Sequence, residues 1–160
     1  MSVDIRILLQ EWLNQSEKDL IREYNDMGLR SSGNLEKSLQ SKVTGTDTIA
    51  VGVMTGSSYI YQLEHGRRPG KQPPIQAILD WINDKGIVAD GISERSLAFI
   101  IARKIGLEGI QVPNRYNNGG LITNTFTDER LKDLRTILTT VIAKDSINDI
   151  VKEIKKEIKK

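Results

Sequence analysis

Few residues in this chain have side chains suited to catalysis or metal binding. His65 is the only histidine and cysteine is absent, which excludes a disulfide, a thiolate metal site and a cysteine nucleophile. Glu64 is adjacent to His65, so on a helix the two side chains point to different sides and do not converge on one ion. We therefore expect His65 to have a structural role at a helix end, and we expect no metal and no cofactor.

Motifs for catalysis are also missing. Asp80 and Asp84 lie four residues apart, a spacing at which like charges repel weakly on a solvated helix. Neither the GxxxxGK[ST] nor the GxGxxG phosphate-binding pattern occurs. We therefore do not expect an enzyme.

The main cluster of functional groups is a basic segment between two predicted helices. It contains Arg67, Arg68 and Lys71, and Pro69 limits the course of its backbone. A rigid loop that carries three cations is suited to contact with a partner. The simpler interpretation is a solvated connector, because exposed charges usually contribute little.

The flanking sequence predicts how this loop is held. Gly66 is placed to end the helix that begins near Tyr59, with Ser57 or Ser58 as its N-cap. The prolines at 73–74 open a second helix, and Gly86 ends it. The segment should therefore connect two packed helices.

Apolar periodicity predicts an α+β protein with a small antiparallel sheet packed by helices, a long N-terminal helix, a long C-terminal helix and an extended loop arm. Residues 49, 51 and 53 are branched and alternate with Ala50 and Gly52, which predicts a strand. We expect one domain over 1–160. Its predicted parts are an N-terminal helix (1–27), a hairpin of two strands (34–54), a helical middle (58–107), a loop arm (111–126) and a C-terminal helix with a charged tail (127–160).

The last 50 residues are predicted to contain two different parts, the loop arm and the last helix. Residues 121–126 alternate, which predicts that the arm returns as a strand and orders on a partner. Thr127 is an N-cap for the last helix, as Ser93 is for the helix before the arm. The apolar stripe of the last helix is expected to continue from Leu131 to Ile158 across a polar break at residues 144–146.

Composition limits the class of protein. The chain has 160 residues, 38% hydrophobic and 28% charged, as in a soluble globular protein. Its beginning lacks the pattern of a signal peptide, and no stretch approaches the roughly 20 apolar residues of a membrane span. We expect a cytoplasmic protein, or one that is assembled into a larger structure from the cytoplasm.

Nucleic-acid binding is the competing interpretation. Six cations could gather on one face with Tyr116 as a stacking surface, namely Arg67, Arg68, Lys71, Arg103, Lys104 and Arg115. The formal net charge is only +2, because 21 acidic residues oppose 23 basic ones.

Three segments share an order and spacing with a known family: GNLEKSL (33–39), YIYQLEHGRRPGKQPP (59–74) and LAFIIARKIGLEGI (97–110). Through them, the chain between Gly33 and Phe126 resembles the neck and tail-completion (head–tail joining, tail-component) proteins of long-tailed bacteriophages. The chain departs from the family pattern after these segments: it has PNRYNNGGLITNTF where the family commonly has an Arg-Pro-Phe cluster, and its last helix is longer and richer in lysine.

The resemblance implies a non-enzymatic virion protein, located in the host cytoplasm during assembly, that forms a ring joining the capsid portal to the tail. Its partners would be copies of itself and neighbouring portal, connector and tail proteins, with weak, sequence-independent DNA contact in the lumen and no membrane. The alternative is a small nucleic-acid-binding protein that uses the basic loop. The expected interface residues are Arg67, Arg68, Lys71, Arg115, Tyr116, Asn117, Asn118 and Phe126.

Overall fold

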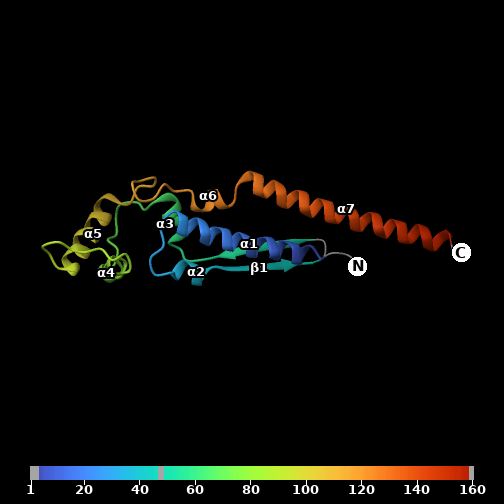
Figure 1. The fold of residues 1–160 in the computed structure, drawn as a ribbon. Helices are drawn as coiled ribbons and strands as arrows, with labels where there is room; N and C mark the ends of the chain where they lie inside the picture. The colour runs from blue at the N-terminus through green and yellow to red at the C-terminus, as the bar shows by residue number, and fades with distance from the viewer. Residues whose placement is uncertain (1–3, 47–48, 159–160) are drawn as a thin grey trace. The chain divides into compact units, whose positions relative to one another are not determined.

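The computed structural model describes residues 4–46 and 49–158, and it has the predicted α+β architecture (Figure 1). Long helices begin and end the described chain, and one antiparallel hairpin forms the sheet. The elements are α1 (Ile5–Asp26), α2 (Asn34–Ser38), β1 (Gln40–Gly45), β2 (Ala50–Thr55), α3 (Ile60–His65), α4 (Ile75–Asp84), α5 (Glu94–Glu108), α6 (Leu121–Thr125) and α7 (Asp128–Ile158).

The chain forms two compact units. The hairpin unit contains α1 as far as Asp19, both strands, and the chain from Thr123 onward. The helical unit contains Leu20–Leu39 and Gly56–Ile122. The expectation that residues 1–160 form one domain stays a prediction.

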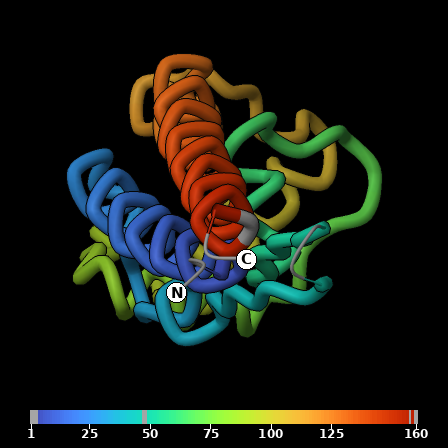
Figure 2. Tube along the Cα trace, turned by 90° about the vertical axis from the view of Figure 1, so that its right-hand side faces the viewer, coloured from blue at the N-terminus to red at the C-terminus, as the bar shows by residue number. Residues whose placement is uncertain are grey.

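In the hairpin unit, the sheet packs its small residues against α1, which runs alongside the strands (Figures 1 and 2). Val43 pairs with Gly52, and a Cβ at Gly52 would lie only 2.7 Å from Leu13 Cδ1. Side chains alternate between the two faces of a strand. Val51 and Val53 therefore point away from α1, and each is about half exposed (53% and 50%).

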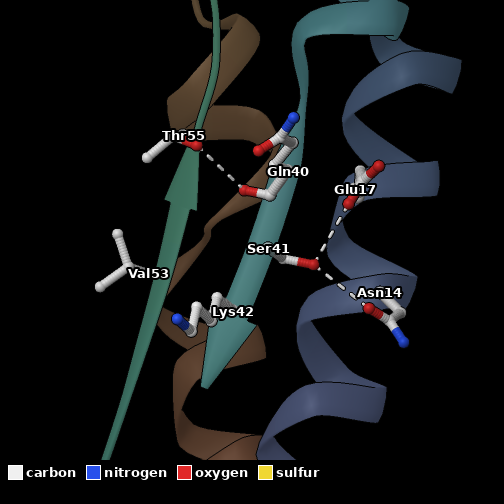
Figure 3. Close-up of a pocket in the computed structure, with 7 residues that line it drawn as sticks. All are labelled: Asn14, Glu17, Gln40, Ser41, Lys42, Val53 and Thr55. Atoms are coloured by element: carbon white, nitrogen blue, oxygen red, sulfur yellow. Dashed lines mark hydrogen bonds between the residues drawn. The ribbon is translucent and has the colours of Figure 1, made fainter. Parts of the chain in front are cut away.

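Polar side chains of α1 cover the free edge of β1. The Val43 N–H donates to Gln10 Oε1 over 3.0 Å. The Ser41 hydroxyl can donate its one proton to either Asn14 Oδ1 or Glu17 Oε2, each 3.2 Å away (Figure 3). The edge of β1 is thus occupied within the chain, whereas no described strand pairs with the outer edge of β2.

The helical unit has its own core. Tyr24, from the last turns of α1, is 2% exposed, and Ile82 of α4 packs in the same unit as the small residues Ala98 and Ala102 of α5, all three fully buried. α4 and α5 form the main helix pair of the unit. Lys85 Nζ donates to the carbonyls of Gly28 and Arg30 over 2.8 and 2.6 Å, which ties the end of α4 to the chain after α1.

Three local predictions were wrong. Residues 34–38 form α2 rather than a strand, because Leu35 and Leu39 are buried at the i, i+4 spacing of one helical turn. Residues 121–125 form α6 rather than a returning strand. Neither Ser57 nor Ser58 caps α3: Tyr59 is its N-cap, with no side-chain cap. Ser57 instead donates its N–H to Ser38 Oγ over 2.9 Å.

Other end signals were correct. Ser93 Oγ accepts the Ser96 N–H over 3.1 Å at the start of α5, and Thr127 Oγ1 accepts the Arg130 N–H over 3.3 Å at the start of α7. Gly66 follows the last residue of α3 with a φ of 80°. α7 is one continuous helix through residues 144–146, where the sequence showed a polar break.

Candidate interaction surface

The basic loop between α3 and α4 is fixed to the end of α5 by backbone hydrogen bonds. Arg67 and Ile110 exchange N–H···O=C bonds in both directions, each 2.7 Å long. The Gly70 N–H donates to the Gly106 carbonyl over 2.8 Å. The loop is therefore a platform held by hydrogen bonds outside its own segment; that it is rigid, as its prolines predict, stays a prediction.

This close approach requires glycine on both sides. A Cβ at Gly66 would lie 2.2 Å from the Ile110 carbonyl oxygen. A Cβ at Gly109, where φ is +75°, would lie 2.2 Å from the Arg67 carbonyl oxygen. Any larger residue at either position would separate the two backbones, so the platform depends on these two glycines.

An open hollow of about 470 Å³ lies where the loop meets the end of α5. The rings of Tyr61 and His65, one turn apart on α3, are in contact with their centroids 4.5 Å apart. Arg67 and Arg68 line the same hollow. The full lining is Tyr61, His65, Gly66, Arg67, Arg68, Pro69, Glu108, Ile110, Gln111 and Val112.

The three cations of the basic loop are not equally available to a partner. Arg67 is half-buried, and its Nη2 donates to the Lys71 carbonyl over 2.7 Å. Arg68 and Lys71 are exposed, and within residues 4–46 and 49–158 neither has a carboxylate at ion-pair distance. Glu108 forms a 3.9 Å ion pair with Lys104. Arg68 and Lys71 can therefore meet an anionic group from outside.

The expected arm folds against α3 rather than extending. Asn117 is buried (9% exposed), its Nδ2 donates to the Leu63 carbonyl over 2.8 Å, and its Oδ1 accepts the Gly119 N–H over 2.8 Å. The Ile122 N–H donates to Glu64 Oε2 over 2.7 Å at the first turn of α6. These bonds order the segment within the chain, so it does not need a partner for its path.

The other expected interface residues lie in different surroundings. Tyr116 is 76% exposed, and the Arg115 guanidinium lies 5.2 Å from the centre of its ring. Asn118 is exposed. Phe126 belongs to the hairpin unit, where its ring is 6.0 Å from that of Trp12. The structure thus gathers Arg67 and Arg68 at one hollow, whose lining includes none of Lys71, Arg103, Lys104, Arg115 and Tyr116.

Two members of the hollow were not expected to act together. Tyr61 was not singled out, and His65 was expected to cap the end of α3, where Gly66 is in fact the C-cap. The signal was present in the sequence, because residues four apart on a helix are neighbours on its surface. The ring contact of Tyr61 and His65 follows from that spacing.

Within the part of the chain that the structure describes, no group of three or more acidic or histidine side chains is arranged to hold a metal ion. None of the described helices is long and apolar enough to cross a membrane. Comparison with protein-family models finds no match, and comparisons with curated proteins and with solved structures find no significant match.

Proposed function

We propose that this chain is a non-enzymatic structural subunit that assembles with copies of itself, as a ring in the neck or head–tail connector region of a bacteriophage virion. The phage assignment rests on the resemblance of residues 33–126 to neck and tail-completion proteins. The assembly role rests on the surface of the molecule, as follows.

The observation that carries the proposal is a pair of exposed valines on the outer face of the hairpin. Val51 and Val53 are half exposed on the face away from α1, where they pair with Thr44 and Lys42 of β1. The outer edge of β2 also has no pairing strand among the described residues. Apolar surface combined with an open sheet edge favours association with another protein.

The basic loop supports the same role. A platform that presents Arg68 and Lys71, neither of which has a carboxylate at ion-pair distance among the described residues, is suited to an acidic patch on a neighbouring subunit. In a ring each subunit uses two different patches, one for each neighbour. The hairpin face and the basic loop lie in different units of the chain and could supply two such patches.

Light scattering on the purified chain over a concentration series tests the assembly. A particle mass that is a multiple of 18.0 kDa is expected, and it should fall when Val51 and Val53 are both changed to threonine. Threonine keeps the branched shape and the strand preference while removing apolar surface. The matched control is Val88→Thr, because Val88 is 86% exposed in the helical unit. An assembly that both variants leave intact would remove the hairpin face from the proposal.

A second candidate function is nucleic-acid binding at the hollow, favoured by the Tyr61–His65 ring pair beside Arg67 and Arg68. Single strands bind where bases can stack on aromatic side chains beside cations; here the two rings are tilted by 54° to each other. Fluorescence anisotropy with a labelled single-stranded oligonucleotide checks this candidate. Binding that weakens with added salt and is lost in Arg68→Glu, but not in Arg135→Glu on α7, would favour it.

A further inference from the structure

The apolar residues of α7 form two stripes that face different directions. Leu138 lies in the first half and lines a hollow of the hairpin unit with Ile5 and Leu9 of α1. Ile147 follows Leu138 by nine residues, and at about 100° per residue the two side chains leave opposite sides of the helix. The stripe therefore does not simply continue, as the sequence pattern had indicated, but changes face.

The second stripe is exposed along its whole length. It repeats every three or four residues, as a helix-packing surface does. Its exposed fractions are 60% for Ile147, 59% for Ile150, 40% for Val151, 53% for Ile154 and 79% for Ile158. Because Leu138 faces the hairpin unit, the opposite side of α7, which carries this second stripe, is turned away from that hollow and is open to another molecule.

Charges beside the stripe indicate which molecule that is. Lys155 follows Ile154 and Glu153 precedes it, so the two flank the stripe on opposite sides, each about 100° from Ile154. Lys144 lies three residues before Ile147, on the same side as Lys155. All three charged side chains are exposed, and Glu153 Oε2 lies 3.9 Å from Lys156 Nζ on the same helix. The stripe thus has one basic and one acidic flank.

This arrangement selects the orientation of a second copy. When two identical helices pack in parallel, the basic flank of one meets the acidic flank of the other, whereas in antiparallel packing each flank meets itself. Antiparallel packing would place Lys144 and Lys155 against the same lysines of the other copy. We infer that residues 147–158 of α7 pack in parallel against the same segment of a neighbouring copy. This inference rests on the proposed self-assembly and adds a contact between like segments of two copies to the two different patches of the ring.

Cysteine cross-linking of the full chain tests this contact without background, because the chain contains no cysteine. Ile147→Cys and Ile154→Cys are each treated with a short bis-maleimide and examined on denaturing gels. In parallel packing each variant alone should give a species of twice the chain mass. Lys156→Cys is the control, since residue 156 lies about 180° from the stripe centre and should not be linked.

The two positions together exclude antiparallel packing. They are seven residues, or about 10.5 Å, apart along the helix. In an antiparallel pair at most one of them can lie opposite itself. Linking of only one variant, or linking only when the two variants are mixed, would therefore overturn the parallel arrangement. Equal linking of Lys156→Cys would overturn it as well.

Light scattering on the same samples separates failure of this inference from failure of the proposed function. A multimer in which neither stripe variant is linked leaves self-assembly standing and removes α7 as a contact. A monomer at every concentration, without linking, counts against both. Circular dichroism at 222 nm checks that α7 stays helical in each variant. The single change Lys155→Glu should weaken linking, because it removes the basic flank. Combining Lys155→Glu with Glu153→Lys exchanges the two flanks and should restore linking.

Discussion

Arg130 Nη1 donates to Asp19 Oδ2 over 2.6 Å, although the two residues are 111 positions apart in the sequence. Both side chains are largely buried, at 24% and 11% exposure. The same guanidinium donates to Ser16 Oγ over 3.0 Å and lies 5.4 Å from the centre of the Trp12 ring. The start of α7 is thus attached to α1 by one arginine, ahead of either apolar stripe.

Replacing Arg130 with alanine should lower the free energy of unfolding of the hairpin unit by about 2 kcal/mol, the scale of a lost hydrogen bond between charged groups in a partly buried site. Urea denaturation followed by circular dichroism measures the change. Arg135→Ala, at an exposed position of the same helix, should change stability by less than about 0.5 kcal/mol. Equal effects of the two variants would show that the Arg130 attachment does not hold the unit together.

Gly109→Ala should disturb the basic loop more than its backbone conformation alone explains. At Gly109 the added Cβ meets the Arg67 carbonyl oxygen at 2.2 Å, whereas at Gly91, with a similar φ of +72°, it meets nothing within 4 Å. Gly91→Ala should therefore cost only the strain of positive φ, about 1–2 kcal/mol. A larger loss of stability is expected for Gly109→Ala, and amide exchange should show the Arg67 and Ile110 N–H groups losing protection. Equal losses would contradict the close approach of the two backbones.

The stability contributed by Tyr59 should depend on pH. Burial, and then a hydrogen bond with Tyr24, raise the pKa of the Tyr59 hydroxyl in the folded chain above its unfolded value of about 10. The neutral form is therefore favoured by folding. Its contribution is complete below about pH 10 and is lost as pH rises further, because only the unfolded chain then ionises readily.

Comparison with Tyr59→Phe isolates this effect from the lysines that titrate in the same range. The difference in unfolding free energy between the wild-type chain and the variant should be constant from pH 7 to 9 and shrink above pH 10. Urea denaturation at each pH gives the difference. A gap that widened above pH 10 would reverse the sign and contradict the raised pKa.

The elements that local sequence signals specify were predicted well. The positive φ at Gly66 and the N-caps Ser93 and Thr127 depend on neighbouring residues only, and so does the alternation around Gly52. α6 was missed because its first turn is bonded by Glu64, 58 residues earlier. A contact at that separation leaves no pattern that a local reading of the sequence detects.

The candidate interaction surface, too, could be predicted from the sequence only in part. The cations of the basic loop were expected from their spacing among prolines, and the structure places Arg67 and Arg68 at one hollow. The partner-bound arm was not found, because Asn117 and Glu64 bind the segment internally. Turn-forming residues such as those at 117–120 have the same composition whether the turn is solvated or packed. The alternation of residues 49–53 also did not say which face of β2 packs on a helix, and in the structure the small residue Gly52 meets α1.

Adjacent asparagines allow a last test of which turn residues serve the fold and which are free for a partner. Asn117→Ala removes the bond to the Leu63 carbonyl and the bond from the Gly119 N–H, both 2.8 Å long and both at a buried side chain. Loss of two such bonds should lower the unfolding free energy by about 1–3 kcal/mol. Asn118→Ala changes an exposed side chain next to it and should leave stability within about 0.5 kcal/mol. Urea denaturation compares the two, and light scattering then shows whether Asn118 matters for assembly. If Asn118→Ala were the more destabilising change, the internal role assigned to Asn117 would be wrong. If Asn118→Ala left stability unchanged but reduced the particle mass, Asn118 would belong to a contact between subunits, and Asn117 would only shape the turn that carries Asn118.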